Sequence, residues 1–203
     1  MTKVKICGLT RTSDIEAVNN YKPDYIGFVF ADFSKRYVSP EEAFKLKQML
    51  IPEIKAVGVF VNEKQDSIIS ILSKDIIDIV QLHGDEDEDY ILSLKAKVSC
   101  PIIKVFNMND FAETDDFGII EKCCADYVMI DSGYGTGKTF DWSKPGRIKR
   151  PFFLAGGLSI ENVSEAIKKL QPYAVDISSG VETDGFKDSE KISKFIQNVR
   201  NNK

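Results

Sequence analysis

The residues best suited to chemistry are a thiol, an imidazole and a carboxyl, each at the end of a short β-branched or aromatic run. Cys7 ends one run, His83 another and Asp131 a third. If these runs are parallel strands of a barrel, their carboxyl ends share one rim, which is where barrel enzymes carry their active sites. A thiol and a carboxyl on roughly opposite strands could then act as base and acid on a small substrate.

Eight such runs recur along the chain, and their spacing leaves room in most gaps for one helix and two short loops. The predicted strands are Lys3–Cys7, Tyr25–Phe30, Lys55–Val61, Ile79–His83, Ile102–Phe106, Tyr127–Asp131, Phe152–Ala155 and Ala174–Ser178. This pattern predicts an α/β protein, a (β/α)8 TIM barrel in a single compact domain. A doubly wound sheet of eight strands is the less economical alternative.

Local signals predict where helices begin. Ser13 and Glu16 have capping-box spacing, and Ser39 followed by Pro40 supplies a cap and a first-turn proline. Further helices are predicted to start near Ser67, Asp89, Asp115, Ser159 and Asp188. The segment Asp141–Lys149 is too short and polar for a full helix.

Alternation within the strands predicts which side chains face the barrel interior. In four strands apolar residues alternate with others, and we expect the apolar parity to face the helices. The opposite parity carries Lys3, Lys5, Cys7, Gln81, His83, Lys104, Asp176 and Ser178. Lys5, Lys104 and Asp176 would then neutralise one another inside the barrel, and the simpler interpretation is that these three are buried filling.

Glycines follow the last two predicted strands, at Gly156 and Gly157 and then at Gly180 after Ser179. Backbone N–H groups and the amino terminus of a short helix could hold a phosphate dianion there. Glycine pairs at strand ends are often simple turns. Their placement after the seventh and eighth strands together favours a phosphate site.

The segment Gly133–Thr139 looks like a P-loop, but that motif requires glycine where Ser132 stands. The segment also follows the sixth strand, and no long helix succeeds it. A nucleotide-binding NTPase is therefore a minor alternative, which failure to bind ATP with magnesium would eliminate.

Cys7 could also be a small core hydrophobe, the commoner fate of a free cysteine. It precedes Gly8, however, and Lys5 shares its parity, so an ammonium could favour the thiolate over its unperturbed pKa of about 8.5. For His83, the only histidine, a structural or substrate-orienting role is favoured over a catalytic one. The remaining cysteines are interpreted as packing residues: Cys100, Cys123 and Cys124.

Composition excludes several classes. The chain is 43% hydrophobic and 29% charged with a net charge of −4, which excludes disordered classes and disfavours a nucleic-acid partner. The only block of like charge is the acidic run Asp85–Asp89. The longest nearly apolar stretch, Tyr25–Ala31, is far shorter than the ~20 residues of a membrane helix. With no secretory signal, no C-x-x-C and one histidine, we expect a cytoplasmic protein with free thiols, no zinc and no membrane partner.

Seven segments, taken in order, resemble the phosphoribosylanthranilate isomerase family. They are Lys5–Thr10, Gly27–Phe30 with Ser34–Ser39, Gly58–Asn62, Val80–Gly84, Gly135–Trp142, Leu154–Leu158 and Val175–Glu182. Each motif is weak alone, but together they span nearly the whole chain at family spacing. The resemblance implies a barrel that works without metal or organic cofactor in tryptophan biosynthesis. The implied reaction is an Amadori rearrangement of N-(5-phosphoribosyl)anthranilate.

The resemblance also implies roles for individual residues. It makes Cys7 the general base, Asp131 the general acid and Arg36 the partner of the anthranilate carboxylate. The implied phosphate loops fall on Gly156, Gly157, Ser179 and Gly180, with His83 as a further substrate-binding residue. We therefore expect residues 1–203 to form one isomerase domain whose partner is a small phosphosugar-anthranilate, with protein partners left open. Lys35 and Tyr134 depart from the family pattern.

Other functions remain open at this point. The nearest rivals are a sugar-phosphate epimerase, which would need metal-ligand histidines, and indole-glycerol-phosphate synthase, which relies on lysine and glutamates at strand ends. A non-catalytic sugar-phosphate-binding barrel belongs to another class. The presence of Cys7 and Asp131 at strand ends argues against it.

Overall fold

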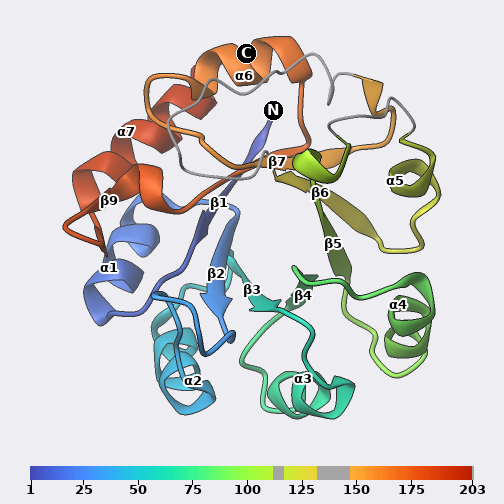
Figure 1. The fold of residues 1–203 in the computed structure, drawn as a ribbon. Coiled ribbons are helices and arrows are strands. Elements are labelled where there is room, and N and C mark those ends of the chain that lie inside the picture. The colour runs from blue at the N-terminus through green and yellow to red at the C-terminus, as the bar shows by residue number, and fades with distance from the viewer. Residues whose placement is uncertain (112–116, 132–146, 203) are drawn as a thin grey trace.

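Eight parallel strands follow one another around a closed barrel, with helices on its outside (Figure 1). The structure is a computed structural model, and it describes residues 1–111, 117–131 and 147–202. The strands are β1 (Lys3–Cys7), β2 (Tyr25–Val29), β3 (Lys55–Phe60), β4 (Ile79–Leu82), β5 (Ile102–Asn107), β6 (Tyr127–Asp131), β7 (Phe152–Ala155) and β8 (Ala174–Ile177). Each starts where the sequence predicted. Pairing of β1 with β8 closes the barrel and excludes the doubly wound sheet.

The strands alternate with short helices. These are α1 (Thr12–Tyr21), α2 (Pro40–Met49), α3 (Gln65–Leu72), α4 (Glu88–Lys95), α5 (Gly118–Lys122), α6 (Val163–Leu170) and α7 (Ser189–Arg200). Two 3-10 turns, η1 (Met108–Phe111) and η3 (Ser179–Val181), and a small hairpin of β9 (Glu182–Thr183) and β10 (Phe186–Lys187) complete the described elements. None of the described helices is long and apolar enough to cross a membrane.

The helix starts test the local signals. The cap at Ser39 is confirmed, since its hydroxyl accepts from the Glu42 N–H at 3.2 Å. The capping box at Ser13 and Glu16 is wrong. The chain enters α1 two residues earlier, because the Asp14 carboxylate accepts from the Arg11 N–H at 3.0 Å and also pairs with the Arg11 guanidinium.

Other predicted starts fall close to the observed ones. Asp188 caps α7 as predicted, whereas α6 begins only at Val163, beyond the predicted start at Ser159. Asp115 lies outside the described residues, as does most of Asp141–Lys149.

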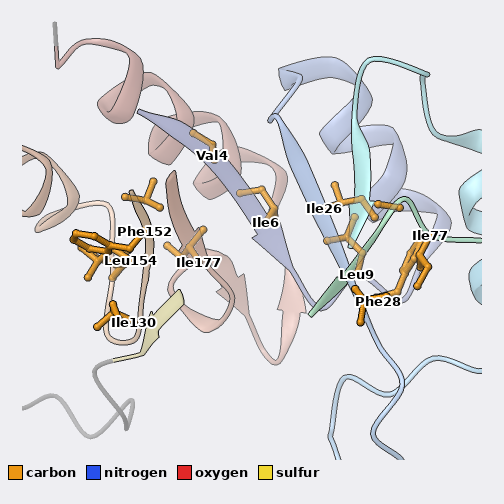
Figure 2. Packing of buried hydrophobic residues seen from close by; sticks show 14 of the residues in the cluster. Val4, Ile6, Leu9, Ile26, Phe28, Ile77, Ile130, Phe152, Leu154 and Ile177 are labelled. Carbon is orange, nitrogen blue, oxygen red and sulfur yellow. The ribbon is translucent and has the colours of Figure 1, made fainter. Parts of the chain in front are cut away.

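The main core lies between the barrel and the helices (Figure 2). Val4, Ile6 and Ile177 belong to it, which confirms that the apolar parity of β1 and β8 faces outward. Cys100, Cys123 and Cys124 pack against this layer, as predicted, and all four cysteines are free. A second apolar cluster fills the inside of the barrel. Its members are Tyr25, Val57, Ile79, Ile103, Val105, Met129, Phe153, Ala155 and Ala174.

The predicted orientation of β5 is wrong. Ile103 belongs to the interior cluster, whereas Lys104 pairs in register with the outward-facing Leu82. The Lys104 ammonium donates to the Glu86 carboxylate at 2.8 Å and to the Gly84 carbonyl at 2.6 Å. Glu86 is buried although it comes from the acidic run, so Lys104 is neutralised there and not by Asp176.

Aromatic side chains occupy the amino end of the barrel. The Lys3 ammonium lies 5.0 Å from the centroid of the Tyr173 ring and 3.3 Å from the Tyr25 hydroxyl. The two tyrosine hydroxyls are 3.2 Å apart, and the Tyr127 ring stacks on that of Tyr173. Phe153 contacts this group from inside the barrel. This end is packed and hydrogen-bonded.

Candidate active site

A cavity of about 470 Å³ opens at the carboxyl ends of the strands. All eight residues that sequence reasoning assigned to a site line it: Cys7, Arg36, His83, Asp131, Gly156, Gly157, Ser179 and Gly180. The side near β2 and β3 is apolar, with Val29, Ala31, Val59 and Val61 and the exposed ring of Phe33. The side near β7 and β8 is made of glycines and serines. The cavity therefore offers different chemistry at its two sides.

Cys7 ends β1 beside a buried ammonium. A Cβ at Gly27 would lie 2.7 Å from the Cys7 sulfur and 3.1 Å from the Lys5 nitrogen, so both groups converge on the space that this glycine leaves. Lys5 is fully buried and donates to the Asp176 carboxylate at 3.0 Å. Asp176 also lines the cavity, so the pair is part of the site and more than filling.

Burial and the neighbouring charges have opposing effects on the pKa of the Cys7 thiol. Burial raises the pKa of Cys7 above its ordinary value, while the Lys5 ammonium acts to lower it and the Asp176 carboxylate to raise it. The predicted effect of Lys5 therefore has the right sign, but burial outweighs it. For Lys5 itself, burial would lower the pKa, yet Asp176 and Cys7 together raise it. Lys5 thus stays a cation.

Asp131 ends β6 and lies close to His83. The His83 Nε2 and the Asp131 Oδ2 are 3.7 Å apart, and the other ring nitrogen of His83, Nδ1, lies 3.4 Å from the Gln81 amide nitrogen. Burial lowers the pKa of His83, although the nearby carboxylates of Asp131 and Asp176 act in the opposite direction. The imidazole is therefore neutral at neutral pH.

Arg36 is held by a carboxylate that its motif did not reveal. Its guanidinium donates to both oxygens of Glu182, at 2.7 and 2.9 Å, and this pairing raises the pKa of Arg36. Gly8 has a φ of +81°, and a side chain there would collide with the Arg36 side chain. Arg36 is thus held between Gly8, which follows β1, and Glu182 in the hairpin of β9 and β10.

Lys187 supports the site from behind the cavity wall, and sequence reasoning missed it. Its buried ammonium donates to Glu182 at 2.6 Å and to the Ser178 carbonyl at 3.0 Å. The Ser178 hydroxyl in turn donates to the Cys7 carbonyl at 3.0 Å. An Asp-Gly turn between Thr183 and Phe186 is a hairpin signal that could have drawn attention to this segment.

The glycine loops lie on neighbouring strands. Gly156 and Gly157 both have positive φ, and Gly180 sits in η3, where a side chain would collide with the Leu158 carbonyl. Only glycine allows the two loops to approach this closely. Such bare backbone is typical of a phosphate site after the last two strands of a barrel.

Some site predictions lie outside the described residues, namely Gly133–Thr139, Tyr134 and the motif Gly135–Trp142. Within the described part of the chain, no group of three or more His, Cys, Asp or Glu is placed to hold a metal ion.

The closed barrel, with an acid, a thiol and glycine loops around a cavity at its carboxyl end, defines a (β/α)8-barrel enzyme. The family model described as N-(5'phosphoribosyl)anthranilate (PRA) isomerase matches residues 4–198. The chain belongs to this family, as its motifs predicted, and is an isomerase of tryptophan biosynthesis. The rival epimerase and synthase families are thereby excluded.

Individual relatives agree. The N-(5'-phosphoribosyl)anthranilate isomerase of Endomicrobium trichonymphae is 45% identical, over 98% of this chain and 99% of that protein. The crystal structure of the Thermotoga maritima enzyme superposes with a TM-score of 0.87 at 37% identity, covering 99% of this chain and 100% of the other. A further structure of such an isomerase holds reduced 1-(o-carboxyphenylamino)-1-deoxyribulose 5-phosphate, with a TM-score of 0.83, 36% identity and the same coverage.

Proposed function

We propose that the chain converts N-(5-phosphoribosyl)anthranilate into 1-(2-carboxyphenylamino)-1-deoxyribulose 5-phosphate, with Cys7 as general base and Asp131 as general acid. The observation that carries this proposal is that both residues line one shared cavity, in which the thiol meets the buried Lys5 ammonium. The reaction is an internal rearrangement, so the proposal requires no metal or organic cofactor.

The two sides of the cavity suit the two ends of this substrate. Gly156, Gly157, Ser179 and Gly180 offer backbone N–H groups to the phosphate. Arg36 and the apolar wall near β2 and β3 suit an aromatic ring that bears a carboxylate. The sugar then lies between Cys7 and Asp131.

Asp131 begins the reaction as the proton donor. It donates its proton to the furanose ring oxygen, the bond from that oxygen to C1′ breaks, and the nitrogen lone pair forms a protonated Schiff base. The carboxylate that remains faces the neutral imidazole of His83. His83 thereby acts as an orienting group.

Cys7 completes the rearrangement as a thiolate. It removes the proton from C2′, and the electron pair of that bond moves toward nitrogen to give an enolamine. The enolamine then tautomerises to the ketone, gaining a proton at C1′ as its C2′ hydroxyl gives one up. Cys7 releases the proton that it took from C2′ and Asp131 regains one, through solvent, so that both groups return to their starting states. Because burial raises the pKa of Cys7, the thiolate depends on the Lys5 ammonium beside it.

The setting of the enzyme follows from the same reasoning. We propose that residues 1–203 act as one isomerase domain in the cytoplasm and that the small-molecule partner is the phosphosugar-anthranilate, with no nucleic-acid or membrane partner. The net charge of −4 supports the absence of a nucleic-acid partner.

The test is to add N-(5-phosphoribosyl)anthranilate and follow the loss of its anthranilate fluorescence. Cys7→Ala and Asp131→Asn should each lower kcat on the order of 10²-fold or more. Cys100→Ala and the exposed Asp110→Asn are matched controls that should retain full activity. Intact turnover in both site variants would refute the assigned roles, and a wild-type protein without turnover would refute the function.

A further inference from the structure

Gln81 is a buried polar residue of the cavity that no step above uses. It is the third residue of β4, only 1% exposed, and it lines the cavity. Among the side chains that the structure describes, its Oε1 is the one buried polar atom without a hydrogen-bond partner. A buried acceptor left unpaired is unfavourable, so this atom marks a place for a donor that arrives with a ligand.

The other half of the carboxamide contacts His83. Its nitrogen lies 3.4 Å from the His83 Nδ1, and an amide nitrogen can only donate. With the amide in this orientation, His83 Nδ1 is the acceptor and the proton of the neutral ring lies on Nε2. That nitrogen is the one 3.7 Å from the Asp131 carboxyl. A chain of contacts thus runs from Gln81 through His83 to Asp131.

The substrate offers few donors to Gln81. Its phosphate and carboxylate are acceptors, which the amide oxygen would repel, so the donors are the sugar hydroxyls and one aniline N–H. Gln81 sits inside the barrel, one pleat below His83, and the sugar occupies the middle of the cavity in the proposed binding mode. A sugar hydroxyl is therefore the donor that fits.

We propose that Gln81 has two roles in this reaction. Its Oε1 binds the substrate by accepting a hydrogen bond from a hydroxyl of the sugar. Its Nε2 positions His83 as the Nε2–H tautomer that faces Asp131. This inference rests on the proposed function for its substrate half. Once Asp131 has given up its proton, the His83 N–H faces the new carboxylate. In that tautomer Nε2 carries no lone pair, so His83 orients Asp131 and takes no proton from it.

The tautomer can be measured without any substrate. His83 is the only histidine, so the ring region of a ¹H–¹⁵N correlation spectrum of labelled protein reports one imidazole. At neutral pH the wild-type spectrum should show the Nε2–H form. Gln81→Glu replaces the amide donor by an acceptor and should shift the ring toward Nδ1–H. A wild-type ring already in the Nδ1–H form, or no change in Gln81→Glu, would overturn the positioning role.

The substrate-binding role is tested with Gln81→Met, which has similar length and no polar atom. We expect kcat/KM to fall about 10-fold or more and Ki for the reduced product analogue to rise on the order of 10-fold. The melting temperature should be unchanged or raised by about 2–4 °C, because an unpaired buried acceptor has been removed. The exposed Gln48→Met on α2 is the matched control and should leave all three values unchanged.

The outcomes separate the two proposals. Wild-type protein without turnover refutes the proposed function, while the spectrum still decides the contact between Gln81 and His83. If the wild type turns over and Gln81→Met retains its kcat/KM and Ki, the substrate-binding role of Gln81 is wrong. A folded Gln81→Met variant that loses activity without losing stability supports it.

Discussion

The two ends of the barrel place a lysine of the same strand in opposite surroundings. Lys3 and Lys5 share one face of β1, yet Lys3 meets tyrosine rings and hydroxyls, and Lys5 meets Asp176 and the Cys7 thiol. At the amino end the polar atoms are paired within the protein. At the carboxyl end the Gln81 oxygen is left without a partner. A barrel of this kind closes one end for stability and leaves the other end to be completed by a ligand.

Lys5→Met should have the largest effect on this contrast. It removes the cation beside Cys7 and leaves Asp176 without its ion-pair partner, so we expect kcat/KM at pH 7 to fall on the order of 10²-fold. The free energy of unfolding should also decrease by about 3–5 kcal/mol. Lys3→Met should retain kcat/KM. Equal activity losses in the two variants would remove the distinction between the ends.

Thiol reactivity sharpens the same contrast. In a background with Cys100, Cys123 and Cys124 replaced by alanine, alkylation by iodoacetamide reports Cys7 alone. Its titration midpoint should lie above the ordinary thiol value, because burial raises its pKa. Lys5→Met should move the midpoint higher and lower the rate at pH 7 about 10-fold, since each pKa unit changes the thiolate fraction tenfold. An unchanged midpoint in Lys5→Met would show that the ammonium has no influence on the thiol.

Glu182→Gln tests the charges at the carboxyl end. The variant keeps an acceptor for Arg36 but loses the charge, so we expect KM to rise about 5- to 10-fold with a smaller change in kcat. Burial alone would raise the pKa of Glu182, but Arg36 and Lys187 hold it below its usual range. Its stabilising contribution is therefore present above its unfolded pKa of about 4.3 and is lost as pH falls through the lower folded value. Acid unfolding curves of the wild type and the variant should converge at low pH, and a constant separation would contradict this.

Tyr173→Phe should have the smallest effect. It removes one hydroxyl from the amino end, where hydrogen bonding to Tyr173 raises the pKa of Lys3, and keeps the ring that stacks on Tyr127. We expect the free energy of unfolding to fall by about 1 kcal/mol in urea titration, with kcat/KM unchanged. A loss of activity would mean that the amino end takes part in the reaction.

Much of the fold was predictable because each strand carries a short β-branched run. The orientation of β5 was not, because alternation alone does not say which parity faces inward when Lys104 can be neutralised on either side. Its actual partner, Glu86, comes from a run of acidic residues that are usually solvated. In the folded barrel, Ile103 packs in the interior cluster and Lys104 lies on the outer parity with Leu82.

The site was predictable as a set of strand ends but not as a set of contacts. Cys7 and Asp131 follow from strand positions, and all eight assigned residues line one cavity. The balance at the thiol depends on burial, which the sequence does not display. Lys187 reaches the site through a hairpin, and Gln81 matters through an oxygen whose lack of a partner only a structure reveals.

The close approach of Gly8 and Arg36 restricts which residues evolution can place at position 8. The arginine side chain occupies the space that any side chain at position 8 would need, and the backbone there has positive φ. A substitution at position 8 is therefore doubly unfavourable, because a smaller residue at position 36 would make room for the side chain but would leave the backbone strain in place. We expect a library that varies position 8 to recover almost nothing but glycine, even in a background with a smaller residue at position 36.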